Sequence, residues 1–209
     1  MYEEARTTFG LMSHDHWWKI VDSFALESRF RMALDILAKK AVSDETASLG
    51  SLAFLVDKGV VQMAINLLPF FQHLVVKCGK LGVLVVMRLS NTNADTWLTA
   101  RNDPQSRHVI AHSQSSASTV VVQHFPPLPI PSGTSVNTTG AGDSLVGALL
   151  AMLVQDPNAF LDPTSLKNVI DVAQEAAIMT LQSSYAVSPS LSSLSAGLPT
   201  PERTSLPSI

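Results

Sequence analysis

The sequence predicts an α/β fold, because stretches with helical spacing of apolar residues alternate with short runs of β-branched residues. A third observation is a glycine-rich loop that leads directly into an apolar helix near the C-terminal end. The chain has 209 residues, of which 46% are hydrophobic and 15% charged, and this is enough to bury a core. We expect helices over residues 2–40, 44–71, 144–154 and 163–183, and strands over residues 73–78, 83–87 and 120–124.

The first two helical stretches should cover a sheet. In the first, Phe30, Leu34 and Leu37 recur at helical spacing and charged residues fall largely between them. The second is rich in leucine, alanine and valine, and Pro69 closes it because proline cannot continue a helix. Both stretches are therefore expected to present an apolar side to the strands that follow.

The strands begin with a predicted hairpin. Residues 79–82 start and end with glycine, which favours a tight turn between the strands at 73–78 and 83–87. Residues 90–118 are polar and irregular, and we expect them to form a surface excursion with little core of its own. A proline cluster over residues 126–131 ends the third strand.

The strongest local pattern is Gly-Ala-Gly-Asp over residues 140–143, ahead of a helix that is apolar on nearly every face and is expected to be buried. Glycines let the backbone approach a ligand, and amides at a helix start favour an anion. Asp143, beside these amides, is placed to accept a proton from a hydroxyl group. The same residues also suit an ordinary helix start with an N-terminal carboxylate.

Residues 137–150 resemble the second signature of the ribokinase or PfkB carbohydrate kinase family, including the small residues Gly147 and Ala148. The resemblance implies a ribokinase-like three-layer α/β/α fold and phosphoryl transfer from ATP with Mg²⁺. It makes Asp143 the catalytic base. It makes three residues the anion hole for the γ-phosphate, namely Gly140, Ala141 and Gly142.

Two further segments resemble the family's nucleotide-binding elements. Residues 75–83 look like its strand-turn-strand element, with Cys78 where threonine or serine is usual, although an ordinary hairpin has the same pattern. Residues 173–188 look like its last helix and the loop that flanks adenine and a monovalent cation. The implied nucleotide contacts are Lys77, Gly79, Gly82, Ala176 and Thr180, and the implied K⁺ ligands are Asn137 and Ser188.

Asn137 departs from the family pattern, because many relatives have aspartate there as a cation ligand. Within the family, Asn137 and residues 97–100 and 125–129 resemble fungal pseudouridine-kinase-like domains, which are often fused to a pseudouridine-5'-phosphate glycosidase. The expected function is ATP-dependent phosphorylation of a sugar or nucleoside hydroxyl, with pseudouridine to pseudouridine 5'-phosphate as one such reaction. The alternative is a truncated nucleotide-binding module, or a gene-model fragment of a glycosidase-kinase fusion, without turnover.

The chain contains neither the family's Gly-Gly pair nor its Asn-x-x-Glu element. We therefore expect residues 1–188 to be the C-terminal, nucleotide-binding part of a kinase domain whose N-terminal strands and lid are missing. We expect a parallel sheet with an exposed apolar edge, which would favour a homo-oligomer or pairing with the missing N-terminal half. Residues 189–209 are rich in serine and proline and are expected to be a disordered tail.

Composition also restricts the expected partners. The formal charge is −3 and there is no dense basic block, so we expect a small-molecule substrate and neither nucleic acid nor a membrane as partner. Cys78 is the single cysteine, which fits a reducing compartment, and we expect the cytoplasm. His14 and His16 flank Asp15, but the sequence offers no further ligands at a zinc-like spacing, and no metal site is predicted there.

Overall fold

The computed structural model describes residues 19–21, 30, 32–34, 36, 52–91, 94–100, 107–112, 118–131 and 137–196. The chain divides into two compact units. The sheet unit comprises residues 1–127 and 160–163, and the helical unit comprises residues 128–159 and 164–209. Within the described ranges, no helix is both long and apolar enough to cross a membrane.

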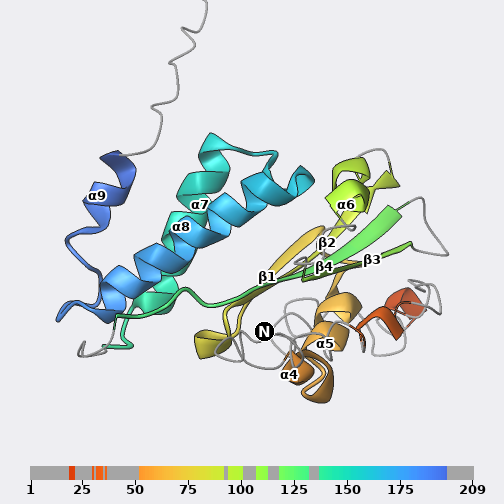
Figure 1. Cartoon of the computed structure of the whole chain (residues 1–209), viewed down its shortest axis with the longest axis horizontal. Helices are drawn as coiled ribbons and strands as arrows, with labels where there is room; N and C mark the ends of the chain where they lie inside the picture. The colour runs from red at the N-terminus through yellow and green to blue at the C-terminus, as the bar shows by residue number, and fades with distance from the viewer. Residues whose placement is uncertain are drawn as a thin grey trace, which may run out of the picture. The chain divides into compact units, whose positions relative to one another are not determined.

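The sheet unit is built on four strands (Figure 1). These are β1 (His73–Lys77), β2 (Val83–Ser90), β3 (His108–His112) and β4 (Ser118–Phe125), in the spatial order β1-β2-β4-β3. The predicted hairpin and the α/β class are confirmed. The expectation of a parallel sheet is wrong for these strands, because all three pairings are antiparallel. Short connections suffice for antiparallel neighbours, whereas parallel strands need a long crossover.

One face of this sheet packs on two short helices, α4 (Ala53–Asp57) and α5 (Val60–Leu67), which lie together below the strands in Figure 1. The sequence predicted one helix here, but Gly59 adopts a left-handed φ of 65° and separates the two. Alternate residues of the strands supply the apolar surface that meets the helices, among them Leu84, Val86, Val120 and Val122. The period of two along each strand places these side chains on the same face.

The segment expected to be a surface excursion instead contributes to the core. It contains α6 (Asp95–Ala100) and β3, and the Trp97 side chain is fully buried. The Trp97 indole Nε1–H donates to the Phe160 carbonyl oxygen at 3.0 Å, and the Phe160 ring stacks on His73 with centroids 4.1 Å apart. The prediction failed because β3 has only five residues, and its three apolar residues are too short a run to stand out from polar flanks.

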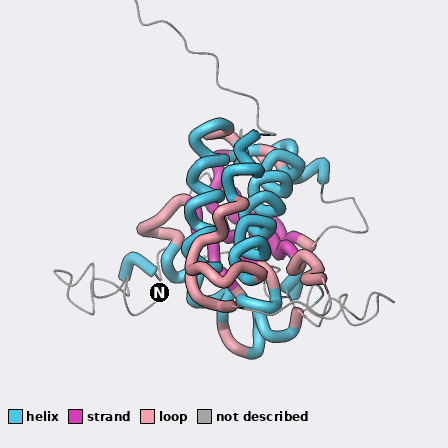
Figure 2. The backbone as a smooth tube through the Cα atoms, turned by 90° about the vertical axis from the view of Figure 1, so that its left-hand side faces the viewer, coloured by secondary structure: helices cyan, strands magenta, loops and turns pink. Residues whose placement is uncertain are grey.

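The helical unit contains α7 (Ala141–Gln155), α8 (Pro163–Leu181) and α9 (Leu191–Ala196), and α7 and α8 run side by side in Figures 1 and 2. The expectation that α7 is buried on all faces is wrong. Val146, Leu150 and Val154 follow one another at helical spacing and are 40%, 57% and 79% exposed. Helix α9 lies within the predicted tail, whereas residues 197–209 lie outside the described residues.

Most of the predicted N-terminal helix falls outside the described residues, as do His14, Asp15 and His16. The described positions in this stretch, residues 19–21, 30, 32–34 and 36, are helical. Phe30 is buried and belongs to the core of the sheet unit.

Candidate active site

The residues predicted to form the anion hole lie at the start of α7. Gly140 is the N-cap with a left-handed φ of 78°, and the helix begins at Ala141. Its first turn closes through the Ser144 N–H, which donates to the Gly140 carbonyl oxygen at 2.9 Å. The amides of the residues in between have no acceptor within the helix, and they carry the positive end of the helix dipole. The residues expected to form the anion hole are therefore placed where an anion is stabilised.

Glycine is required at position 140 because the backbone of another loop lies directly against it. A Cβ atom at this position would lie 1.7 Å from the Ala186 carbonyl oxygen, so no larger residue fits without movement of one backbone segment. The left-handed φ adds a second reason for glycine. The close approach brings the loop after α8 against the loop that precedes α7, within the helical unit. A signature glycine that looked like a ligand-binding feature is thus also a packing requirement.

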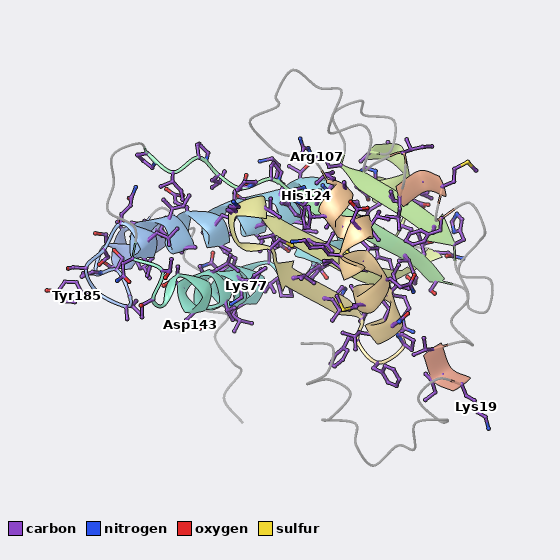
Figure 3. The ribbon with its side chains drawn as sticks, turned by 90° about the horizontal axis from the view of Figure 1, so that it is seen from below. Lys19, Lys77, Arg107, His124, Asp143 and Tyr185 are labelled. Carbon is purple, nitrogen blue, oxygen red and sulfur yellow. The ribbon has the colours of Figure 1, made fainter. Side chains whose placement is uncertain are left out.

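Asp143 lies in the first turn of α7 and its side chain is exposed (Figure 3). It lines a cavity of about 350 Å³ in the helical unit. A carboxylate in this position is accessible to a substrate and sits beside the helix-start amides. The geometry is compatible with the predicted role of catalytic base, because the side chain is not sealed inside packing.

The rest of this cavity is lined mainly by apolar and small side chains from α7, α8 and α9. Such walls suit a flat aromatic group such as a purine ring, while Asp143 and Ser144 provide polar atoms at one side. The lining residues are Asp143, Ser144, Gly147, Ala148, Ala151, Met152, Val172, Ala176, Val187, Leu191 and Leu194. Ala176 was predicted to contact the nucleotide, whereas no pattern in the serine-rich tail indicated that Leu191 and Leu194 would line this cavity.

Thr180 holds the helices of this unit together. It is fully buried, and its hydroxyl lies 2.7 Å from the Ser144 Oγ and accepts the Ser188 N–H at 3.3 Å. The three residues connect α7, the end of α8 and the loop that follows. Direct contact between Thr180 and a nucleotide stays a prediction. The observed hydrogen bonds show that Thr180 helps to position the first turn of α7, which contains Asp143.

Asn137 and Ser188, the residues implied as K⁺ ligands, are both hydrogen-bonded to protein groups. The Asn137 Nδ2 group donates to the carbonyl oxygens of Ser183 and Tyr185, at 3.2 and 3.4 Å. Its Oδ1 accepts the Thr139 N–H at 3.1 Å. The Ser188 Oγ accepts the Ser190 N–H at 3.3 Å. Asn137 therefore ties the loop after α8 to the chain just ahead of the anion hole.

The sheet unit contains the other predicted nucleotide residues, on the turn between β1 and β2. Lys77 and Gly79 are exposed, and a side chain at Gly79 would meet nothing within 4 Å, so this position is open to a ligand. Gly82 is buried, and a Cβ there would lie 2.1 Å from the Phe125 carbonyl oxygen. The Cys78 N–H donates to the Gly82 carbonyl oxygen at 2.8 Å and closes the turn.

The His124 side chain forms a hydrogen bond to this turn, a role that was not predicted from the sequence. Its Nε2 lies 2.7 Å from the Leu81 carbonyl oxygen, which can only accept, so Nε2 carries the hydrogen. Burial lowers the pKa of His124 to about 4, so the ring is neutral at neutral pH. Burial also raises the pKa of Cys78, which keeps its thiol protonated beside the same turn. A histidine within an apolar strand is the signal that could have identified this support.

No cluster of three or more potential metal-ligating side chains occurs in the part of the chain that the structure describes. A magnesium ion that accompanies ATP is normally held by one or two carboxylates together with phosphate oxygens. Asp143 is the acidic residue that lines the cavity. The residues present are thus compatible with Mg²⁺ that arrives bound to a nucleotide, with Asp143 as the nearby carboxylate.

The chain is similar to known proteins over most of its length. The pfkB family carbohydrate kinase pattern matches residues 56–193. The chain is 26% identical over 185 residues to a pseudouridine-metabolizing bifunctional protein of Schizosaccharomyces pombe, an alignment that covers 87% of this chain and 20% of the relative. It is 45% identical over 56 residues to fructokinase-1 of Oryza sativa subsp. japonica, which covers 27% of this chain and 17% of the relative.

The chain spans about a fifth of the length of these two curated relatives. The family match, in contrast, covers well over half of the chain and includes both glycine turns, at residues 79–82 and 140–142. The resemblance inferred from residues 137–150 is confirmed: the chain belongs to the pfkB family of carbohydrate kinases.

Proposed function

We propose that this chain carries the catalytic base and the phosphate-binding amides of an ATP-dependent kinase that phosphorylates a hydroxyl group of a sugar or nucleoside. The observation that carries the proposal is the exposed Asp143 in the first turn of α7, beside amides without helical acceptors and on the wall of a cavity. Family membership supports the reaction class. Phosphoryl transfer depends mainly on positioning and on stabilisation of charge, which these groups supply.

Each residue has a distinct role in this proposal. Asp143 accepts the proton of the acceptor hydroxyl while that oxygen attacks the terminal phosphorus. The amides of Gly140, Ala141 and Gly142 stabilise the oxygens of the transferred group. The apolar cavity wall that includes Ala176 holds the adenine ring. Lys77, Gly79 and Gly82 of the sheet unit are the further nucleotide contacts that the family resemblance implies. ATP bound with Mg²⁺ supplies the phosphoryl group and neutralises its charge.

Pseudouridine is the acceptor that we propose first. Support comes from the S. pombe relative, which is described as pseudouridine-metabolizing and aligns over most of this chain. The shorter match to a rice fructokinase makes a hexose the acceptor to compare with it. The single cysteine, Cys78, supports a reducing compartment, and we propose the cytoplasm.

The test is an assay of ADP release and of product mass with MgATP and pseudouridine, uridine, ribose or fructose as acceptor. We expect Asp143→Asn to lower kcat by about 10²- to 10⁴-fold, because the base is lost while the phosphate-binding amides remain. The matched control is Asp57→Asn, which makes the same change at an exposed position of α4 and should leave kcat unchanged.

Two results would count against the proposal in different ways. If Asp143→Asn turns over as fast as the wild-type chain, Asp143 is not the base. If the chain binds MgATP in calorimetry but transfers phosphate to none of the acceptors, the chain is a nucleotide-binding module without turnover.

A further inference from the structure

The Asn137 side chain occupies a position between two backbone carbonyl groups of one loop. These carbonyls belong to Ser183 and Tyr185, and their oxygens lie 3.2 and 3.4 Å from the Asn137 Nδ2. The Asn137 backbone N–H also donates to the Leu181 carbonyl oxygen at 2.8 Å. Three carbonyl oxygens at the end of α8 thus turn towards one residue, and converging carbonyls of this kind need either a cation or hydrogen-bond donors.

The orientation of the Asn137 amide is determined by its partners. The Thr139 N–H is a donor, so the side-chain atom 3.1 Å from it must be the acceptor Oδ1. The opposite atom is then the NH₂ group, whose two hydrogens are directed to the Ser183 and Tyr185 oxygens. Exchange of the two atoms would place an oxygen against two carbonyl oxygens and a donor against a donor. The network therefore has one consistent assignment.

We propose that the side-chain amide of Asn137 takes the place of a monovalent cation in this loop, so that the helical unit is organised without K⁺. A cation requires ligands that offer lone pairs, and an aspartate at position 137 would supply them. Asparagine instead turns the positive end of its amide dipole towards the carbonyls. The hydrogen-bond donors that satisfy these carbonyl oxygens in place of a cation are part of the chain itself.

Ser188, the other residue implied as a cation ligand, is also engaged. It is 5% exposed, its N–H donates to the Thr180 Oγ1, and its Oγ accepts the Ser190 N–H. Both candidate ligand oxygens, on Asn137 and on Ser188, thus receive protein N–H groups. The set of donors and acceptors is satisfied internally and does not fit a K⁺ site.

This arrangement gives Asn137 a positioning role for the proposed active site. Asn137 holds the loop that contains Ala186, and the Ala186 backbone lies directly against Gly140 at the start of the anion hole. In a cation-dependent arrangement the same loop would be ordered only when the ion is bound. In this chain the Asn137 side chain orders the loop instead. The link to catalysis rests on the proposed function, whereas the independence from K⁺ does not.

The test compares thermal unfolding of the whole chain in KCl and in choline chloride of equal ionic strength, without nucleotide. We expect the wild-type melting temperature to be the same in the two salts, to within about 1 °C. Asn137→Asp should melt lower in choline chloride by on the order of 5 °C, because a carboxylate then faces two carbonyl oxygens. KCl should restore most of this loss in the variant, since K⁺ can bind between the new carboxylate and the carbonyls.

The matched control is Asn168→Asp, which makes the same charge change at an exposed position of α8 and should respond equally to the two salts. Saturable stabilisation of the wild-type chain by K⁺ would overturn the proposal, and so would an Asn137→Asp variant that folds in both salts but gains no stability from KCl. Should this variant fail to fold in either salt, the wild-type comparison alone decides. No nucleotide is present, so the outcome does not depend on whether the chain is an active kinase.

Discussion

The two units support their glycine turns by different kinds of interaction. In each unit a glycine with positive φ lies against a backbone carbonyl, Gly82 against Phe125 and Gly140 against Ala186. The turn at Gly82 rests on a buried sheet, and the His124 side chain donates a hydrogen bond to its Leu81 carbonyl oxygen. The loop at Gly140 is held by hydroxyl and amide hydrogen bonds from Thr180 and Asn137.

This difference indicates where each unit is vulnerable. An apolar core responds to loss of volume, so substitutions in the sheet unit should reduce global stability. A loop held by a few polar contacts opens locally at lower cost, so substitutions in the helical unit should first affect the residues proposed to form the anion hole. Four predictions test this contrast, in order of decreasing expected effect.

The largest effect is expected in the sheet unit, from Trp97→Ala. The indole is fully buried and donates to the Phe160 carbonyl oxygen, so truncation removes packing and leaves an unpaired acceptor. We expect the free energy of unfolding to fall by about 3–5 kcal/mol in chemical denaturation. The adjacent exposed Thr96→Ala is the control, and equal stability of the two variants would contradict a core role for α6.

The second effect concerns pH and His124. Its pKa is about 4 in the folded chain and 6.5 as the reference value, so between these values the unfolded chain binds a proton that the folded chain excludes. The stabilisation is complete above pH 6.5 and is lost as pH falls towards 4, by roughly 3 kcal/mol in all.

His124→Gln should lack this component when denaturation curves are compared across the same pH window. If the variant and the wild-type chain lose stability in parallel, burial of His124 is not the cause. The exposed His112, on β3, offers the matched substitution, His112→Gln, as the control for replacing a histidine in this sheet.

The third effect lies in the helical unit, at Gly140. Alanine there combines a strained positive φ with a Cβ 1.7 Å from the Ala186 oxygen, so we expect a loss of about 1–3 kcal/mol. Hydrogen exchange should show the loss as faster exchange in residues 183–190. Gly147→Ala is the contrasting change, because its Cβ would meet nothing within 4 Å, and this helical position should gain about 0.5–1 kcal/mol.

The smallest effect is expected on the outer face of α7. Leu150 is 57% exposed, so Leu150→Ala should change stability by no more than about 0.5 kcal/mol. Its neighbour Leu149 is 7% exposed, and Leu149→Ala should cost about 2–5 kcal/mol. A large cost at Leu150 in denaturation measurements would show that a further surface covers this face.

Several features could be predicted from the sequence because they depend on neighbouring residues. Glycines at both ends of residues 79–82 predicted the hairpin, and the glycines before Asp143 predicted a helix start with free amides. Pro69 and Pro163 lie near the end of α5 and at the start of α8, as local backbone chemistry requires. The family was also recognisable, because its signature is one contiguous segment.

Other features depend on partners that are distant in the chain. The apolar composition of α7 could not show that Val146, Leu150 and Val154 remain exposed, since exposure depends on which surfaces meet the helix. The short strand β3 was hidden because its stability comes from pairing with β4 and not from its own pattern. The direction of strand pairing is likewise a property of the assembled sheet.

By itself, the sequence determined the α/β class, the hairpin turn, the helix start at residues 140–143 and the candidate base Asp143, because backbone preferences act over a few residues. Only the tertiary structure decided that Gly140 is needed for Ala186, that Thr180 joins α7 to the loop after α8, and that the Asn137 amide faces two carbonyls. These contacts join positions more than thirty residues apart in most cases, and hydrogen-bond direction and close approach exist only once the chain has folded.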